Sequence, residues 1–375
     1  MTRIARVEAT THRVPVKVPF IKGDLARTVL VTRVETDDGA VGWGLGHPSV
    51  GTREAINSQM GPFVVGRNPL QIEAIWDALW WEFNQRAQTG TVMSAISAID
   101  IALWDIRGKQ LGQPVWRLLG GFQQRVPAYV TFGLPDYDVN QLAEAAKYWV
   151  SRGADKLKMV VAKRKWFWPH DQPRSFTGAR DVEEDVVRVR AVREAVGDGV
   201  ELMVDANYLY DYESARTFAR LAEPYNLSWF EEPVYGNDPK LLARLRHETR
   251  IPIAAGQNEG HRYKFRDFIL NESLDILQPN VLSVGGYTEA VKVAHMAHAF
   301  NLPIANGGAW PHHNLHLQAA VPNGTRVEFH LLAWLVGDAL FKSPPTHDHG
   351  WVVAPDQPGL GLDVNEETLK ETKVA

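Results

Sequence analysis

Three polar side chains follow short apolar runs at equal intervals along this chain. They are Asp205, Glu231 and Gln257, and the steps from 205 to 231 and from 231 to 257 are 26 residues each. That interval suits one strand, one helix and two loops. Polar groups at the carboxyl ends of successive parallel strands converge on one point only if the sheet curls into a barrel. The spacing therefore predicts a β/α barrel with these three groups at its mouth.

Strand and helix patterns alternate from Val126 onward. The predicted strands cover 126–132, 155–161, 201–205, 227–231, 251–255, 274–278, 302–306 and 326–330, with amphipathic stretches such as 181–195, 213–222 and 288–300 between them. Eight apolar strands in about 200 residues favour a parallel barrel over an open sheet. A long loop between residues 161 and 181 carries three aromatic residues in succession, at positions 166–168. We expect it to line a pocket or to pack on a neighbouring subunit.

The first 125 residues are expected to form a separate α+β domain. Strand patterns over 28–35 and 41–44 flank Asp37-Asp38-Gly39, a hairpin turn signal, and the apolar spacing over 94–105 predicts a helix. We therefore expect one domain over 1–125 and a barrel over 126–349. The tail, about 350–375, is expected to pack back on the first domain.

Composition excludes several classes of protein. A net charge of −4 and a pI near 6.4 give no basic footprint for nucleic acid, and the absence of cysteine excludes disulfides and thiolate nucleophiles. The N-terminus lacks the apolar core of a signal peptide, and no apolar run approaches membrane-spanning length. We expect a cytoplasmic protein that binds neither nucleic acid nor membranes.

Two lysines lie on one predicted strand. Lys156 and Lys158 are two residues apart, so both are expected to point into the barrel. Mutual repulsion, and a nearby divalent cation, would favour a neutral amine, which is the form that a lysine base needs. The alternative is an exposed strand edge, but the apolar residues around the pair favour a buried strand.

Asp205 and Glu231 are oxygen ligands of the type that Mg²⁺ prefers. Either carboxylate, taken alone, is explained as well by capping of the helix that follows its strand. Together with the lysines, they indicate a metal-assisted proton-transfer enzyme.

The order of the motifs resembles the enolase superfamily, in its mandelate racemase-like subgroup. The resemblance rests on Lys156-x-Lys158, Asp205-x-Asn207, Glu231-Glu232-Pro233, Gly285-Gly286, the helix 97–105, and the segments 118–121 and 358–361. It covers nearly the whole chain. It implies a modified TIM barrel, (β/α)₇β, capped by an α+β domain that the N-terminal part and the C-terminal tail build together. It also implies a Mg²⁺ that binds a substrate carboxylate while the α-proton is removed to give an enediolate.

The resemblance assigns roles to matching positions. Lys158 would be the base, with Lys156 tuning its pKa, and Asp205 and Glu231 would bind the metal. Glu328 matches a carboxyl group that hydrogen-bonds the substrate carboxylate, which requires a proton on it and a raised pKa. The alternative for Glu328 is an ion-paired carboxylate at the end of a strand.

Several positions depart from the family pattern. Gln257 stands where the third metal ligand is usually an acid, and Glu259 is a possible replacement. Asn280 and Gly307 stand where the subgroup has an Asp–His dyad. His312 and His313 are predicted either to reach the mouth as a replacement acid or to be solvated at a helix start. The predicted substrate-binding residues are His47, Asn207, Asn280 and Trp310.

These features favour a dehydratase that converts an acid sugar to a 2-keto-3-deoxy acid, because a recognisable base lies on only one face. A racemase or epimerase, which needs a second base, and a cycloisomerase for sugar-acid lactones are alternatives. A weakly active or non-catalytic binding protein is a further alternative, because Gln257, Asn280 and Gly307 each remove a charged group. The resemblance also implies self-association into a homo-oligomer.

Overall fold

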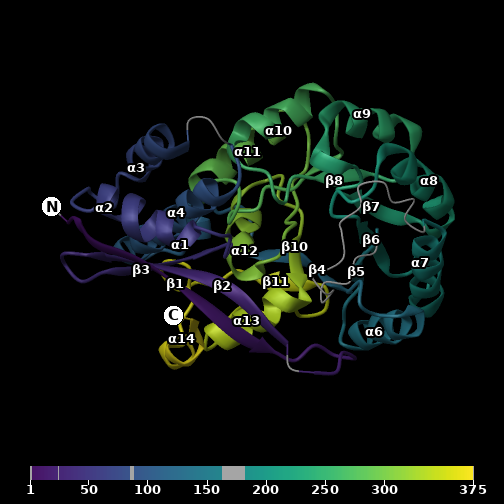
Figure 1. Cartoon of the computed structure of the whole chain (residues 1–375), viewed down its shortest axis with the longest axis horizontal. Helices are drawn as coiled ribbons and strands as arrows, with labels where there is room; N and C mark the ends of the chain where they lie inside the picture. Colours follow the sequence, from purple (N-terminus) through teal and green to yellow (C-terminus); the bar gives the residue numbers. More distant parts are fainter. Residues whose placement is uncertain (1, 24, 85–87, 163–181, 375) are drawn as a thin grey trace.

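A computed structural model describes residues 2–23, 25–84, 88–162 and 182–374. Figure 1 shows a twisted antiparallel sheet covered by helices, next to a ring of strands surrounded by helices. The aromatic loop predicted between residues 161 and 181 lies mostly outside the described residues. Within the described chain, no helix is both long and apolar enough to cross a bilayer.

The N-terminal sheet contains the predicted hairpin. Its strands are β1 (Ile4–Val16), β2 (Leu25–Thr36) and β3 (Val41–Gly46), joined by β12 (Lys373–Val374). The helical segments of this part are α1 (Thr52–Ala55), η1 (Ile56–Met60), α2 (Gly61–Val64), α3 (Ile72–Leu79), η2 (Trp80–Asn84), α4 (Thr91–Leu111) and α5 (Val115–Leu118). The predicted helix 94–105 is confirmed as the centre of α4, whose apolar residues share one core with Leu30 and Val34 of β2.

The second part contains the predicted parallel strands. They are β4 (Arg125–Gly133), β5 (Lys156–Val160), β6 (Glu201–Asp205), β7 (Leu227–Glu231), β8 (Ile253–Ala255), β9 (Ile276–Leu277) and β10 (Val327–His330). The helices around them are α6 (Val139–Ser151), α7 (Val182–Val196), α8 (Tyr212–Ala222), α9 (Pro239–Glu248), α10 (His261–Leu270), α11 (Gly286–Ala299), α12 (Pro311–Ala320) and α13 (Leu331–Leu340), with the short turns η3 (Glu223–Tyr225) and η4 (Tyr235–Asn237). Aspartates cap several of these helices; Asp211, for example, accepts the Ser214 N–H at 2.8 Å before α8.

The barrel closes through the segment around Ile304, where the seventh strand was predicted. The Ala305 N–H donates to the Leu277 carbonyl of β9 at 3.0 Å, and the Ile304 N–H donates to the Asn323 carbonyl at 2.8 Å. Strand β10 then pairs in parallel with β4. The closed barrel with its cap matches the predicted fold class.

Strand register sets which side chains share a level inside the barrel. Val160, Asp205 and Glu231 are register partners at the carboxyl ends of β5, β6 and β7. Lys158 pairs with Met203 one layer below. That layer belongs to the apolar filling of the barrel, which includes Tyr129 and Trp229. Asp205 and its register partners therefore line the barrel mouth. The Lys158 side chain extends toward the mouth from the layer below.

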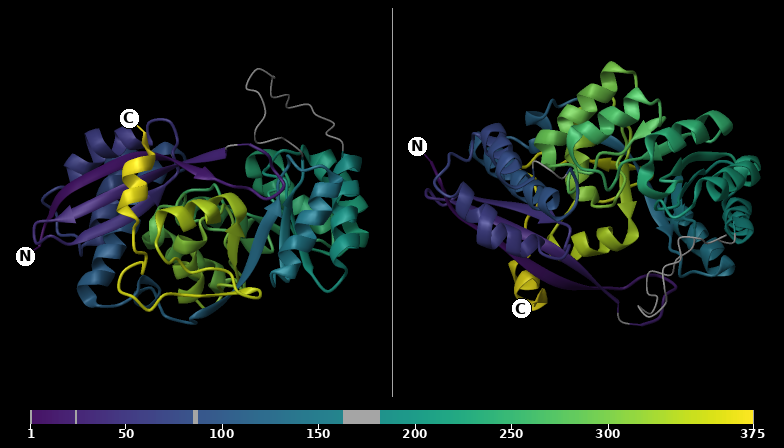
Figure 2. Two further views of the ribbon diagram at one scale, coloured as in Figure 1. Left: turned by 90° about the horizontal axis from the view of Figure 1, so that it is seen from below. Right: turned by 45° about the horizontal axis from the view of Figure 1, so that its top comes forward.

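The C-terminal tail contacts both parts of the molecule. Strand β11 (Trp351–Val353) pairs antiparallel with β4 of the barrel, whereas α14 (Glu366–Thr372) leads to β12 on the edge of the N-terminal sheet. Figure 2 shows α14 lying across that sheet. Helices α4 and α11 also join the two parts, because the Trp104 indole N–H donates to the Thr288 hydroxyl at 2.9 Å.

Candidate active site

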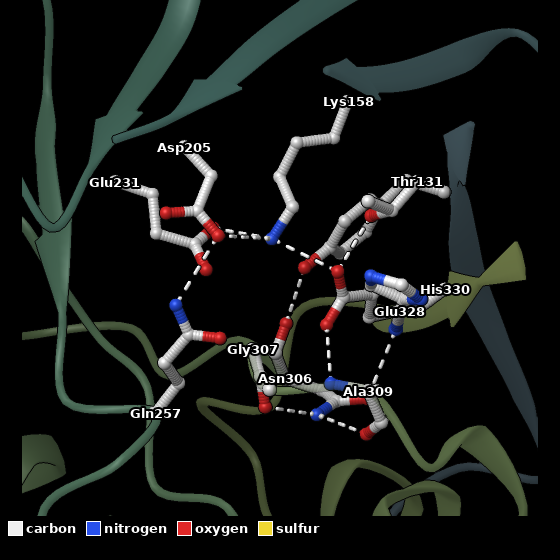
Figure 3. Close-up of polar contacts among 12 residues, drawn as sticks. Thr131, Lys158, Asp205, Glu231, Gln257, Asn306, Gly307, Ala309, Glu328 and His330 are labelled. Atoms are coloured by element: carbon white, nitrogen blue, oxygen red, sulfur yellow. Dashed lines mark hydrogen bonds and ion pairs between the residues drawn. The ribbon is translucent and has the colours of Figure 1, made fainter. Parts of the chain in front are cut away.

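Lys158 is the centre of a buried cluster of charged groups. Its ammonium group lies 2.7 Å from Glu231 and 2.9 Å from Glu328, and 3.7 Å from Asp205. The side chains of Lys158, Glu231 and Glu328 are at most 1% exposed. Figure 3 shows the amine between the Asp205–Glu231 pair on one side and Glu328 on the other. The carboxylates predicted from the regular spacing therefore do converge.

The cluster carries more negative than positive charge when all its groups are ionised, since three carboxylates surround one ammonium. Burial raises the pKa of Asp205 to about 6 and that of Glu231 to about 8, although Lys158 opposes both shifts. Burial also favours a neutral Lys158, but the carboxylate charges outweigh it and raise the pKa of Lys158 well above its usual value. The protein groups alone therefore keep the proton on Lys158, and the neutral amine stays a prediction that depends on the divalent cation.

Lys156 does not lie at the barrel mouth. It begins β5, pairs in register with Glu201 at the start of β6, and forms an ion pair with Asp155 at 2.8 Å. Lys156 and Lys158 are on the same face of β5, as predicted, but Lys156 is at the start of the strand, at the end of the barrel opposite the mouth. The mouth position on the same face is occupied by Val160. The prediction that Lys156 tunes Lys158 at the mouth is therefore wrong.

Glu328 is fully satisfied and ionised. Its carboxylate accepts the Thr131 hydroxyl at 2.5 Å and the Ala309 N–H at 2.6 Å, besides contacting Lys158. Burial raises the pKa of Glu328, but the positive charge of Lys158 and the hydrogen bonds outweigh burial, and the net shift is downward. The predicted raised pKa of Glu328 is wrong, and the ion-paired alternative describes it.

Gln257 acts as a hydrogen-bond donor between two acids. Its amide nitrogen lies 3.2 Å from Asp205 and 2.9 Å from Glu232. To offer its oxygen to a metal, the amide would have to turn over and give up both bonds. Glu259 instead accepts from Asn237 at 3.1 Å, and Asn237 separates it from Glu232. Its predicted role as a replacement ligand finds no support in these contacts.

The residues present fit a loosely held Mg²⁺. Across the described ranges, no three acidic, histidine or cysteine side chains are grouped as a metal site. Among the described residues, Glu231 Oε1 is nevertheless buried without a hydrogen bond of good geometry, beside the carboxylate of Asp205 and next to the Gln278 amide. Mg²⁺ commonly binds through one or two carboxylates, with water and substrate completing its shell. Asp205 and Glu231 would be those two groups.

A cavity of about 470 Å³ opens above the cluster, and we call it the mouth cavity. Asp205 and Gln257 form part of its floor, and the predicted substrate-binding residues His47, Asn207 and Trp310 line its walls. His47 comes from the capping part, hydrogen-bonds Ser283 at 3.0 Å, and has its pKa lowered by burial to about 4. The structure therefore brings these three residues to the site.

Sequence reasoning missed His330, which lines the mouth cavity together with Arg27 of the capping part. His330 ends β10, two residues after Glu328, so the alternation of that strand could have identified it. Burial lowers the pKa of His330 to about 4, which makes the imidazole neutral. Its Nδ1 accepts the Leu332 N–H at 3.3 Å.

His312, His313 and Asn280 do not line the mouth cavity, although Asn280 donates to the Gly308 carbonyl of its wall at 3.2 Å. The two histidines are buried in α12 and packed near Phe341, so the prediction that one of them reaches the mouth is wrong, and so is the solvated alternative. Burial lowers the pKa of His312 to about 4. Asn280 is fully buried and bonds Asn314 and the backbone of Leu282, which makes it structural rather than substrate-binding.

Two positions that face the cluster carry no group able to transfer a proton. Val160 lies at the level of Asp205 and lines the mouth cavity. A Cβ at Gly307 would meet the Gln278 amide nitrogen at 2.8 Å and would lie 3.1 Å from Glu231 Oε1. Lys158 is consequently the group of the cluster that can carry a proton to or from carbon.

Comparison with known proteins agrees with this architecture. The N-terminal domain of mandelate racemase and muconate lactonizing enzyme matches residues 1–120, and the enolase C-terminal domain-like family matches residues 141–368.

Relatives match over nearly the whole chain. An arabinonate dehydratase of Saccharolobus solfataricus is 32% identical over 92% of this chain and 90% of its own. A 3,6-anhydro-alpha-L-galactonate cycloisomerase of Streptomyces coelicolor is 33% identical, with 98% of both chains covered. The crystal structure of L-talarate dehydratase from Polaromonas sp. JS666, complexed with Mg and L-glucarate, has a TM-score of 0.84 and 30% identity over 100% of this chain and 98% of the other. This chain belongs to the mandelate racemase and muconate lactonizing enzyme family of the enolase superfamily.

Proposed function

We propose that this protein is a Mg²⁺-dependent enzyme that removes the proton α to the carboxylate of an acid sugar and dehydrates it to a 2-keto-3-deoxy acid. The observation that carries the proposal is the Lys158 cluster beneath the mouth cavity. Its excess negative charge suits a divalent cation, and its one amine suits proton transfer. Dehydratases of sugar acids among the relatives support the choice of reaction.

Asp205 and Glu231 would hold the metal. Bound there, Mg²⁺ would engage the substrate carboxylate, stabilise the negative charge that develops on it, and offset the acids that now keep the proton on Lys158. Neutral Lys158 then accepts the proton from C2. The same amine returns that proton to the C3 hydroxyl as the C3–O bond breaks, so one water leaves. The resulting enol gains a proton at C3 and loses the proton of its C2 hydroxyl, which gives the 2-keto acid.

A single proton carrier predicts elimination on one face of the substrate. Val160 and Gly307 offer no second acid or base facing the cluster. When Lys158 moves both protons, the departing hydroxyl and the C2 proton lie on the same side of the substrate. His330 and His47, neutral imidazoles that line the mouth cavity, are the candidate proton donors for a hydroxyl on the other side.

The test is incubation of a panel of aldonates and aldarates with enzyme and Mg²⁺ in D₂O, followed by NMR. The expected result is a 2-keto-3-deoxy acid from at least one sugar acid, with no product when Mg²⁺ is chelated. Opening of a lactone without a keto product would indicate a cycloisomerase, the activity of one relative. Inversion at C2 would indicate an epimerase.

A second candidate function is ligand binding without turnover. It is favoured by Gln257 acting as a donor and by the apolar Val160 at the mouth. Binding of a sugar acid by calorimetry, with neither product nor deuterium exchange at C2, would support this function and contradict the first.

We also propose that the chain self-associates. Exposed aromatic side chains such as Trp81, at 60%, and Phe122, at 56%, offer apolar contact area. Light scattering during gel filtration measures the mass directly, and a monomer at micromolar concentration would contradict this proposal.

A further inference from the structure

A second cavity adjoins the mouth cavity. It measures about 570 Å³ and lies between the cap and the barrel loops that follow β7 and β8; we call it the side chamber. It is lined in part by Ser49, Ser94, Tyr208, Asn237 and Glu259. The residues that line both cavities are His47, Pro48 and Asn258. The proposed reaction uses only the mouth cavity, so the side chamber has no part in the chemistry described above.

The lining of the side chamber selects against two classes of ligand. The described residues that line it include no Leu, Ile, Val, Met or Phe, so an apolar ligand would gain little from burial there. They also include no Lys or Arg, and Glu259 would repel a second carboxylate or a phosphate. What remains is hydroxyl and amide groups, which suit an uncharged ligand rich in hydroxyls.

Asn237 provides a fixed acceptor in this wall. Its side-chain nitrogen donates to Glu232 at 3.0 Å and to Glu259 at 3.1 Å, which fixes the orientation of the amide. Its side-chain oxygen is buried and has no hydrogen-bond partner among the described residues. A buried acceptor left unpaired costs free energy, so a shift of Asn237 that brings this oxygen to a ligand hydroxyl in the side chamber would be stabilised.

Tyr208 supplies a flat surface in the same wall. Burial raises the pKa of its hydroxyl to about 12, so the phenol stays neutral and can both donate and accept. An aromatic ring with a polar tip suits contact with the apolar face and the hydroxyls of a sugar ring.

We propose that the substrate is a sugar acid extended by a second, uncharged sugar unit, which occupies the side chamber while the carboxylate lies at the Asp205–Glu231 end of the mouth cavity. The inference rests on the proposed function for the carboxylate end. Because the reaction needs a free C2–H and a free C3 hydroxyl, the second sugar must be attached at O4, O5 or O6. Each cavity alone is within the range, about 300–1,000 Å³, that holds one small ligand.

The experiment compares gluconate and galactonate with two glycosylated aldonates, lactobionate (linked at O4) and melibionate (linked at O6). Binding is measured by calorimetry with Mg²⁺ present, and turnover by formation of the 2-keto acid. Ser49→Trp places an indole in the side chamber. Val50→Trp is the matched control, since Val50 is the next residue, is 98% exposed, and lines no part of the side chamber.

The expected result is that the wild-type protein binds at least one glycosylated aldonate more tightly than the matching simple aldonate. Ser49→Trp should lower that preference at least tenfold, and Val50→Trp should leave it unchanged. Equal or weaker binding of both glycosylated aldonates, or an equal effect of Ser49→Trp on simple and glycosylated acids, overturns the inference. Binding without turnover of any acid would instead reject the proposed function, and the inference about the side chamber would stand.

Discussion

At the residue scale, the site depends on one ammonium group held by three acids. Lys158 is fully buried, and a buried ammonium is tolerated only when it is paired and hydrogen-bonded. Glu328 is satisfied on both oxygens, whereas Glu231, among the described residues, has one oxygen without a hydrogen bond of good geometry. The cluster is therefore anchored on the Glu328 side and open to a further cation on the Glu231 side.

Replacing Lys158 by Met removes the amine and keeps the length of the side chain. We expect turnover to fall by about 10²–10⁴-fold, the usual contribution of a general base. We also expect the free energy of unfolding to fall by about 3–5 kcal/mol without metal, because the acids lose their counter-charge. Lys156→Met is the control, since that lysine pairs with Asp155 and should be close to neutral. A Lys158→Met enzyme within tenfold of the wild-type rate would contradict the assignment.

Gln257→Glu adds a third carboxylate next to Asp205 and Glu232. Without metal it replaces two donated hydrogen bonds with charge repulsion, so the melting temperature should fall. With Mg²⁺ it should raise the affinity about tenfold, or 1.4 kcal/mol. Thermal unfolding across a Mg²⁺ series measures both effects, and a variant that Mg²⁺ stabilises no more than the wild type would show that position 257 does not face the metal.

At the element scale, the sequence was informative because strand patterns and strand ends are local signals. Seven of the eight predicted strands are present as strands. The remaining one, predicted over 302–306, is the Ile304 segment that closes the barrel. The prediction for Lys156 was wrong about its position along the barrel axis. Alternation determines the face of a strand on which a residue lies, but not which residue is at the end of the strand. The errors at His312 and His313 have another cause, because only tertiary packing shows that α12 is buried on all sides.

The junction of α4 and α11 depends on a glycine. Gly286 has a φ of +77°, and a Cβ there would collide with the Asp100 carboxylate of α4. We expect Gly286→Ala to cost more than the about 1–2 kcal/mol of a left-handed residue alone. Gly66→Ala is the control, with φ +82° and open space around its Cβ. Equal losses in chemical denaturation would show that the contact with Asp100 contributes nothing.

At the scale of the whole molecule, the cap and the barrel form one packed unit. Asp100 of the cap accepts the Thr288 N–H of the barrel at 3.1 Å. One apolar cluster includes both Val29 of the N-terminal sheet and Val130 of the barrel. The position of His47 over the mouth therefore depends on docking that no local sequence signal reveals.

The contact between Asp100 of the cap and Thr288 of the barrel predicts that the free energy of unfolding depends on pH. Burial raises the pKa of Asp100 to about 7, against about 4 for an unfolded aspartate. The folded protein therefore holds this proton more tightly than the unfolded chain does. The contribution of this proton to the stability of the folded protein is complete below pH 4, and it is lost as the pH rises through 7. Asp100→Asn should remove this part of the slope between pH 4 and 8 in denaturation experiments, and an unchanged slope would contradict the raised pKa.

The most direct test of the central claim is calorimetric titration of the purified protein with Mg²⁺. The Lys158 cluster should bind one Mg²⁺ per chain in the millimolar range or tighter. Asp205→Asn should abolish binding, and Lys158→Met should strengthen it, because the ammonium competes for the same carboxylates. A wild-type protein that binds no Mg²⁺ at millimolar concentration, or an Asp205→Asn variant that binds it as well as the wild type, would contradict the account.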